Sequence, residues 1–120
     1  MISIITPIYN GTQFIRENIE CIQKLAIPYE HIVVDGGSND GSLDIIKEYK
    51  DLTVINQIEK SGMYGAIDMG FSIAKGKYIC WINCDDRIIK NGFEAMYHHA
   101  IKEKKDFVCS DGVFLYTHTN

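Results

Sequence analysis

The hydrophobic pattern along the chain switches repeatedly between the period of a strand and the period of a helix. Short apolar runs rich in β-branched residues predict strands, and the segments between them carry apolar residues at helical spacing. Apolar strands that alternate with amphipathic helices are typical of a mostly parallel sheet covered on both faces. The pattern therefore predicts a three-layer α/β fold. The expected strands are 2–9, 31–35, 52–58, 77–83 and 106–111, with 112–120 as a partial sixth.

Each predicted helix presents an apolar stripe, and local signals indicate where two of the helices begin. Asn10 with Gln13 forms a capping-box-like start for the first helix. Asn91 with Glu94 is expected to cap the last helix in the same way. The expected stripes are Ile15, Ile19, Ile22 and Leu25 in the first helix, Met63, Ile67, Phe71 and Ala74 in the third, and Phe93, Met96, Tyr97, Ala100 and Ile101 in the last.

The composition argues against nucleic acid as a partner and against a membrane span. A net charge of −4 gives no electrostatic attraction to a phosphate backbone and little to anionic lipid. Apolar residues make up 46% of the 120 residues and charged residues 23%, as expected of one globular domain. No apolar run reaches the roughly 18 residues of a spanning helix, and the first ten residues lack the basic start of a signal peptide. Four cysteines without a CxxC pair suit a reducing compartment, so the cytoplasm is the expected location.

Polar side chains follow four of the predicted strands at the point where each strand ends. In open parallel sheets, ligands bind outside the carboxyl ends of the strands, at one shared edge. The sequence therefore predicts a binding site at this edge. The residues expected there are Thr6 and Tyr9, Asp35, Lys60, and Asp85 with Asp86.

The adjacent carboxylates Asp85 and Asp86 follow the most apolar of these strands. Two like charges side by side repel each other, and paired carboxylate oxygens suit a hard divalent cation that also binds a substrate phosphate. Such a cation would act as a Lewis acid on a diphosphate leaving group. The competing interpretation is a solvated turn in which one carboxylate caps the next helix. The position after a buried strand favours Mg²⁺ or Mn²⁺.

Two further motifs have both a functional and a purely structural interpretation. The stretch "VDGGSNDGS" places Asp35 at a strand end, where it can accept a hydrogen bond from a base N–H or a ribose hydroxyl, or can close a tight turn. Neither GxGxxG nor GxxxxGK[ST] is present, which argues against a dinucleotide fold and excludes a P-loop. Lys60, just before the third helix, can contact phosphate or can be a solvated charge.

The segments "ISIITPIYN", "HIVVDGGSNDGS" and "SGMYGAIDMGFSIAKGKYICWINCDD" together resemble the family 2 glycosyltransferases with a GT-A fold. The resemblance extends from residue 2 to about residue 111. It is closest to the bacterial branch that builds capsular, exopolysaccharide and lipopolysaccharide chains. It implies a Rossmann-like nucleotide-binding half, a nucleotide-sugar donor (UDP-sugar favoured), Mn²⁺ or Mg²⁺, and an inverting transfer to a glycan or lipid-linked acceptor.

The resemblance also implies roles for individual residues. Thr6, Pro7 and Tyr9, together with Asp35, would hold the nucleoside. Asp85 would lie near the ribose and the metal, and Asp86 would ligate the metal. Lys60 stands where the family commonly has an acid, and this departure bears on the phosphate contact expected from its place before the third helix. Three further departures bear on the donor-sugar and phosphate contacts: Gly65, Asp68 and Met69, where the branch usually has Asp, Asn and Lys.

The family's general base is typically the Asp of a Glu-Asp motif well after the metal site. This chain has no Glu-Asp dipeptide, so no catalytic base is assigned and the base is expected beyond Asn120. Residues 1–120 are then one nucleotide-sugar-binding domain that ends before the acceptor and base region, and the chain alone is expected to be inactive in transfer. The full-length protein could associate peripherally with the inner face of the membrane, and an uncovered apolar face would favour a homodimer.

Two other functions fit part of this pattern. A catalytically incomplete module would bind a nucleotide-sugar without turnover. A nucleotidyltransferase has a similar sheet and metal carboxylates, but it needs a basic, glycine-rich loop after the first strand, and "PIYNGTQ" contains no Lys or Arg. The histidines show no spacing typical of a nucleophilic triad.

Overall fold

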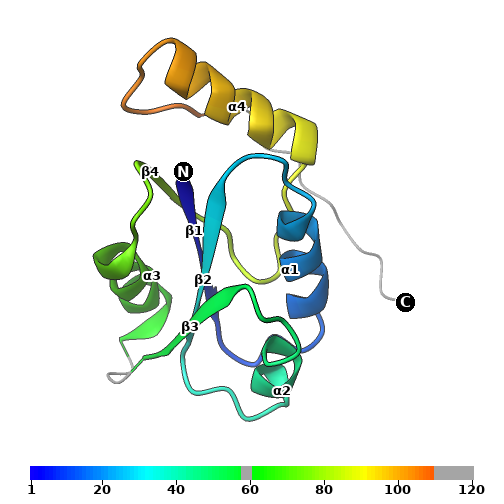
Figure 1. Ribbon diagram of the computed structural model, residues 1–120. Helices are drawn as coiled ribbons and strands as arrows, with labels where there is room; N and C mark the ends of the chain where they lie inside the picture. The colour runs from blue at the N-terminus through cyan, green and yellow to red at the C-terminus, as the bar shows by residue number, and fades with distance from the viewer. Residues whose placement is uncertain (58–60, 110–120) are drawn as a thin grey trace.

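The chain folds into a parallel four-stranded sheet with helices on both faces (Figure 1). The computed structural model describes residues 1–57 and 61–109. All strand pairs are parallel, and the strand order is β3-β2-β1-β4. The elements, in chain order, are β1 (Ile2–Ile8), α1 (Ile15–Gln23), β2 (Tyr29–Asp35), α2 (Ser42–Ile46), β3 (Leu52–Asn56), α3 (Gly62–Ile73), β4 (Tyr78–Trp81) and α4 (Lys90–Lys102).

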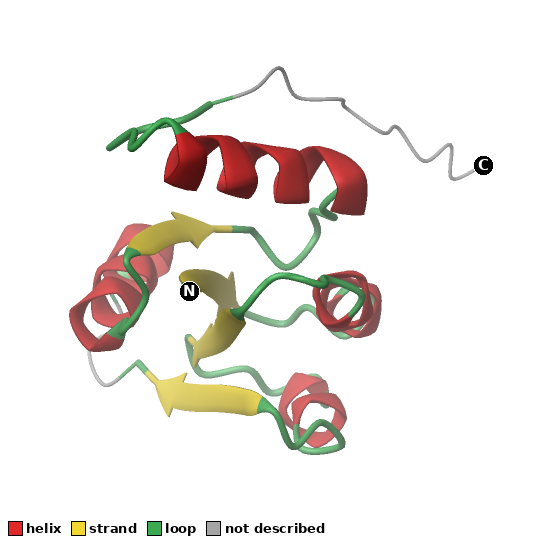
Figure 2. Cartoon of the chain, turned by 45° about the horizontal axis from the view of Figure 1, so that its top comes forward, coloured by secondary structure: helices red, strands yellow, loops and turns green. Residues whose placement is uncertain are grey.

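α3 lies on one face of the sheet, α1 and α2 lie on the other face, and α4 lies beside the edge strand β4 (Figure 2). On one face, Ile5 of β1 packs in a cluster with Ala66 of α3. On the other face, Ile4 and Ile8 pack in clusters that include α1, α2 and α4. Because successive strand residues point to opposite faces, both faces of β1 are buried. The three-layer fold predicted from the sequence is confirmed.

The strand register brings the carboxyl ends of the strands to one edge. Ile8 at the end of β1 pairs with Asp35 at the end of β2, and Asp35 pairs with Asn56 at the end of β3. On the other side of β1, Ile5 pairs with Trp81 at the end of β4. The chain leaves β1 toward β2 and later returns to β4 on the opposite side of β1. The strand order thus reverses between β1 and β4, and such switch points form binding crevices.

The predicted cap of the first helix is wrong. α1 begins only at Ile15 and has no side-chain cap. Asn10 instead has a φ of 51°, and its Oδ1 accepts a hydrogen bond from the Asn39 backbone N–H at 2.8 Å. A local pattern could not reveal this contact, because the partner comes from the loop after β2.

The predicted cap of the last helix and parts of two stripes are also wrong, and Ile101 of the last stripe is exposed. α4 begins at Lys90 without a side-chain cap, and the Glu94 carboxylate accepts from the Ala26 backbone N–H at 2.7 Å. In α3, Met63 and Phe71 are exposed, and the buried residues are Ala66, Ile67 and Gly70. Among residues 1–57 and 61–109, no helix combines the length and the apolarity needed to cross a membrane.

The expected strand at 106–111 is not present in its described part, residues 106–109. A strand needs a neighbouring backbone as well as an apolar pattern. Here the chain turns back at the end of α4, where Lys105 N–H donates to Ala100 O at 2.9 Å. The Tyr78 hydroxyl oxygen lies 3.0 Å from Ala100 O and 2.9 Å from Lys105 O, and its one proton is shared between these carbonyls, which holds the turn against β4. Residues 110–111 and the partial strand at 112–120 lie outside the described residues.

Close packing of α3 on β1 depends on Gly70. A Cβ at this position would lie 2.5 Å from Ile5 Cγ2, which is closer than real Cβ atoms approach. Gly70→Ala is therefore expected to lower the free energy of unfolding by about 1–3 kcal/mol, since overpacking outweighs the gain in helix propensity. Gly92→Ala in α4 is the matched control, because nothing lies within 4 Å of its Cβ position. Urea unfolding compares the two, and equal stability of both variants would contradict the packing argument.

Candidate functional site

A cleft of about 640 Å³ lies at the carboxyl edge of the sheet. Its walls come from the loops after all four strands and from the start of α3. Its volume is in the range of small-molecule sites. The lining residues are Pro7, Ile8, Tyr9, Asn10, Gly11 and Phe14 after β1, Gly36 after β2, Gln57 after β3, Gly62, Met63 and Ala66 at α3, and Asn83, Cys84 and Asp85 after β4.

Three residues predicted from the sequence meet in this cleft. Pro7 and Tyr9 come from the end of β1, and Asp85 comes from the loop after β4. Tyr9 is 64% exposed, so much of its ring is available to a ligand. Asp86 is exposed beside Asp85 but does not line the cleft. Lys60 lies outside the described residues.

Thr6 lies at the same strand end, but its side chain points into the interior. It is fully buried, and its hydroxyl donates to Asn18 Oδ1 at 3.3 Å. The hydroxyl oxygen also lies 2.8 Å from His31 Nε2. Because the hydroxyl proton is used toward Asn18, Nε2–H is the donor in the contact with His31. The side chain of Thr6 therefore connects β1, β2 and α1 beneath the cleft.

Asp35 is also buried, at 2% exposure, and it shapes the loop after β2. Its carboxylate accepts hydrogen bonds from Gly37 N–H at 3.0 Å and from Ser38 N–H at 3.1 Å. Gly37 has a φ of 100°, which favours glycine at this position. Asp35 does not itself line the cleft, whereas Gly36 beside it does. Asp35 therefore closes a tight turn, and a contact between Asp35 and a nucleotide stays a prediction.

Asp40 ties the loop after β1 to the loop after β2. Its carboxylate accepts from the backbone N–H and the hydroxyl of Thr12, both at 3.1 Å. It also accepts from Ser42 N–H at 3.0 Å and from the Ser42 hydroxyl at 2.6 Å. These hydrogen bonds, led by the one from the Ser42 hydroxyl, lower the pKa of Asp40 to about 2.

The tie through Asp40 predicts a pH dependence of stability. The pKa is lower in the folded chain than in the unfolded chain, so the stabilisation is fully present above pH about 4 and is lost as the pH falls toward about 2. Asp40→Asn is expected to be less stable than the wild type at neutral pH, and this difference should shrink with acidification. Urea unfolding over this range tests it, with the exposed Asp68→Asn as control. A difference for Asp40→Asn that does not change with pH would refute the tie.

The loops after β1 and β4 approach each other closely at Gly11. A Cβ on Gly11 would lie 2.9 Å from Cys84 Sγ, so a larger residue would push the β4 loop away. Burial raises the pKa of the Cys84 thiol, and the charge of Asp85 raises it further. The thiol therefore remains protonated at neutral pH, and it is not a nucleophile of this cleft.

The side chains after β4 offer oxygen atoms suited to a divalent cation. Asp85 and Asp86 are exposed, and Asn83 Oδ1 is buried without a hydrogen-bond partner among the described residues. Within those residues, no group of three or more His, Cys, Asp or Glu side chains could hold a metal alone. Mg²⁺ is usually bound by one or two carboxylates together with substrate phosphates. The residues present fit a cation that is shared with a phosphate ligand.

Sequence reasoning missed several residues of the cleft. Asn10, with its positive φ, and Gln57 line it from the loops after β1 and β3. Gln57 Nε2 donates to Ser61 Oγ at 2.7 Å and to Gly62 O at 3.1 Å, which connects β3 to the start of α3. The Asn10-Gly11 dipeptide is a turn signal that could have identified the first of these positions. No local signal identifies Gln57.

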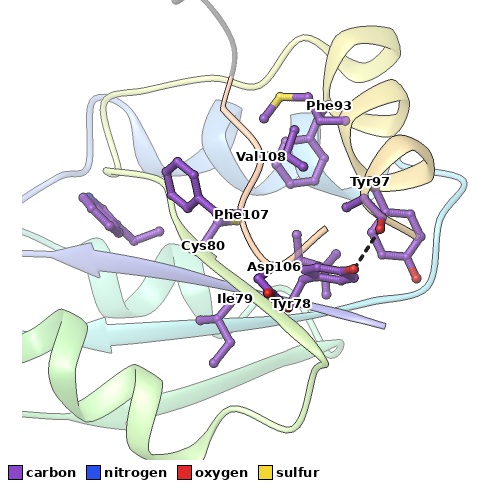
Figure 3. A pocket seen from close by; sticks show the side chains of 12 residues that line it. Tyr78, Ile79, Cys80, Phe93, Tyr97, Asp106, Phe107 and Val108 are labelled. Carbon is purple, nitrogen blue, oxygen red and sulfur yellow. Dashed lines mark hydrogen bonds between the residues drawn. The ribbon is translucent and has the colours of Figure 1, made fainter. Parts of the chain in front are cut away.

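A second hollow, of about 270 Å³, lies between β4, α4 and residues 106–108 (Figure 3). Ile79, Phe93 and Val108 are among its apolar side chains. None of the residues predicted to bind nucleotide, phosphate or metal lines it. The cleft at the carboxyl edge, which Tyr9 and Asp85 line, is therefore the candidate site.

Comparison with known proteins agrees with this geometry. Poly(ribitol-phosphate) beta-glucosyltransferase of Bacillus spizizenii is 34% identical over 113 residues, which are 88% of this chain and 18% of that protein. S. aureus TarS 1-349 in complex with UDP-GlcNAc has a TM-score of 0.78 at 26% identity, over 88% of this chain and 32% of that chain.

A more distant solved structure also carries a metal. Mannosyltransferase PcManGT from Pyrobaculum calidifontis, in complex with GDP-Man and Mn²⁺, has a TM-score of 0.67 at 25% identity. The match covers 72% of this chain and 28% of that chain. Across the curated relatives with the strongest matches, the aligned part spans between 18% and 39% of the relative's length.

The family comparison covers nearly the whole chain. The sequence profile described as "Glycosyl transferase family 2" matches residues 3–117. This range includes the cleft, the buried Thr6 and Asp35, and both carboxylates after β4. The chain therefore belongs to glycosyl transferase family 2.

Proposed function

We propose that this chain binds the nucleotide-sugar donor of an inverting glycosyltransferase that acts in bacterial surface-polysaccharide synthesis. The observation that carries the proposal is the cleft at the β1/β4 switch point, which the exposed Tyr9 and Asp85 line, with Asp86 exposed next to Asp85. A relative that acts on poly(ribitol-phosphate) and a neighbour solved with UDP-GlcNAc support this proposal and favour UDP as the nucleotide.

Each group around the cleft has a distinct role in this proposal. The exposed ring of Tyr9 offers a face on which a base can stack, with Pro7 beside it. The turn that Asp35 holds places the Gly36 backbone at the cleft, where a ligand can approach closely. Asp85 lies on the ribose side of the diphosphate. The diphosphate then lies between the β1 loop and the β4 loop.

Asp85 and Asp86 would hold Mn²⁺ or Mg²⁺, which supplies neutralisation of the diphosphate charge when bound. In the transfer, the acceptor hydroxyl attacks the anomeric carbon and the bond from that carbon to the diphosphate oxygen breaks. The hydroxyl proton passes to a general base, and no base is assigned among residues 1–57 and 61–109. The contribution of this chain is to bind and orient the donor.

Calorimetric titration of the chain with UDP tests the proposal. UDP is expected to bind, and its affinity is expected to be at least about 100-fold higher with Mn²⁺ than with EDTA, because the cation joins the carboxylates to the diphosphate. Parallel titrations with GDP determine the base preference, and uridine without phosphate separates the stacking contribution. Absence of UDP and GDP binding in Mn²⁺ would overturn the proposed function.

A further inference from the structure

The side chain of Asn18 reaches from α1 to the backbone of the loop that carries Asp85 and Asp86. Asn18 is 1% exposed and lies on the buried face of α1 among isoleucines. Its Nδ2 donates to Asn83 O at 3.1 Å and to Asp86 O at 3.0 Å. Both carbonyls belong to a tight turn that Asp86 N–H closes onto Asn83 O at 2.9 Å. One buried amide therefore binds both ends of the turn.

The orientation of this amide follows from its partners. A carbonyl oxygen can only accept a hydrogen bond, so the two carbonyls of the turn require the NH₂ group of Asn18. The other end of the amide, Oδ1, accepts from the Thr6 hydroxyl, which in turn contacts His31. The oxygen end of the Asn18 amide is thus held by a buried hydrogen-bond network of α1, β1 and β2. Such networks limit the side chain to one rotamer.

Apart from those to Asn18, the polar contacts of the loop to the rest of the described chain lie near its two ends, and Cys84 packs against the cluster of Ile8 and Ile15 between them. Ile82 N–H donates to Ile5 O at 2.8 Å just after β4. Arg87 forms an ion pair with Glu17, which neighbours Asn18 on α1. Between these points, the adjacent carboxylates of Asp85 and Asp86 repel each other, so their directions depend on the backbone of the turn. Among the described residues, Asn18 is the side chain that hydrogen-bonds to this backbone.

We infer that Asn18 is a positioning residue, which fixes the Asn83–Asp86 turn and thereby directs Asp85 and Asp86 toward a metal-bound diphosphate; this inference rests on the proposed function. Asn18 touches neither the nucleotide nor the metal. It acts through the turn, as supporting partners of metal ligands commonly do. A buried Asn on an otherwise apolar stripe is costly unless its hydrogen bonds are satisfied, and two of the three found here go to this turn.

Asn18→Leu tests the inference, because leucine has a similar shape and no donor. The ratio of the UDP dissociation constants in EDTA and in Mn²⁺ is expected to fall about tenfold or more, as for other supporting partners of metal ligands. The affinity in EDTA should change less than about threefold. Ser3→Ala is the matched control: Ser3 is equally buried and accepts from Gly76 N–H at 2.8 Å, but it lies at the opposite end of β1. It should leave the ratio unchanged.

Amide hydrogen exchange gives a second readout that does not depend on nucleotide. In Asn18→Leu, protection of residues 83–88 is expected to fall more than protection of the sheet, whereas Ser3→Ala should not show this local loss. If Asn18→Leu does not fold, Asn18→Ala replaces it in both measurements, since water can then reach the two carbonyls.

Three outcomes would overturn the inference: unchanged exchange in 83–88, an unchanged ratio, or an equal fall of the ratio in Ser3→Ala. Failure of the proposed function is distinguishable from these. In that case the wild type itself shows no UDP binding or no effect of Mn²⁺. Faster amide exchange of residues 83–88 in Asn18→Leu would then still show that Asn18 stabilises the turn.

Discussion

Replacement of Asp86 by alanine is expected to abolish the effect of Mn²⁺ on UDP binding, with a loss of affinity in Mn²⁺ of about 100-fold or more. Replacement of a residue that only supports a metal ligand lowers metal affinity roughly 10–100-fold, so loss of a ligand itself should lower it at least as much. Asp86 is exposed beside the cleft, and its carboxylate is one of only two in the turn after β4. Asp85 alone would leave the cation and the diphosphate poorly joined.

The measurement is a UDP titration in Mn²⁺ and in EDTA for the wild type and three variants. Asp86→Ala should bind UDP in Mn²⁺ no better than in EDTA. Asp85→Ala should weaken binding under both conditions, since Asp85 lines the cleft beside the ribose position. Asp51→Ala removes an exposed carboxylate at the amino end of β3, on the far edge of the sheet, and should match the wild type. An effect of Mn²⁺ in Asp86→Ala equal to that in Asp51→Ala would exclude Asp86 as a metal ligand.

The sequence predicted the four strands of the described sheet and the edge at which the cleft lies, because both depend on periodicity. Apolar runs identified all four strands of the described chain, and parallel pairing follows from the helices between them. The rule that ligands bind at carboxyl strand ends then grouped Tyr9 with Asp85, although 75 intervening residues separate them in the sequence. Both residues line the cleft. Position along a strand was thus enough to place a residue at the edge.

The direction of each side chain was harder to predict than its position. Thr6 and Asp35 lie at the predicted edge, but both side chains are buried and bind neighbouring protein groups. The inward direction of the Thr6 side chain could have been predicted from the alternation of the strand. Residues 4, 6 and 8 share one face of β1, and α1 covers that face. Asp35 closes an Asx-type turn, because Gly37 and Ser38 offer their N–H groups locally, and its contact with nucleotide stays a prediction.

Contacts between distant segments could not be predicted from local patterns. Asn10 and Glu94 look like capping residues in the sequence, but each accepts a hydrogen bond from a backbone N–H in another part of the chain. Asn18 is different, because a polar residue on an isoleucine stripe is visible in the sequence. That signal indicates a buried polar partner without saying which one. Only the fold identifies the partner as the turn that carries Asp85 and Asp86.

The buried His31 is expected to make the fold sensitive to mild acid. Burial lowers the pKa of His31 to about 4, from an ordinary value of 6.5. Its Nε2–H donates to Thr6 Oγ1, and Nδ1 has no hydrogen-bond partner among the described residues, so a proton on Nδ1 would place an unpaired charge in the core. Because the pKa is lower in the folded chain, the unfolded chain binds more protons between these two values. Stability is therefore highest above pH about 6.5 and falls as the pH approaches about 4.

The size of this effect can be isolated with His31→Gln, which removes the titrating group and keeps a donor for Thr6. Between pH about 7 and about 4, the wild type should lose about 3 kcal/mol more of its free energy of unfolding than the variant does, since each unit of pKa difference corresponds to about 1.4 kcal/mol. Urea unfolding followed by circular dichroism measures both curves. His98→Gln in α4 is the control, because His98 is exposed and its replacement should leave the acid profile unchanged. Parallel pH profiles for the wild type and His31→Gln would mean that His31 does not enter the folded core as the neutral imidazole. The hydrogen bond between His31 of β2 and Thr6 would then not be part of the network that reaches Asn18. In that case only residues of β1 and α1 would hold Asn18 in place below the turn of Asp85 and Asp86.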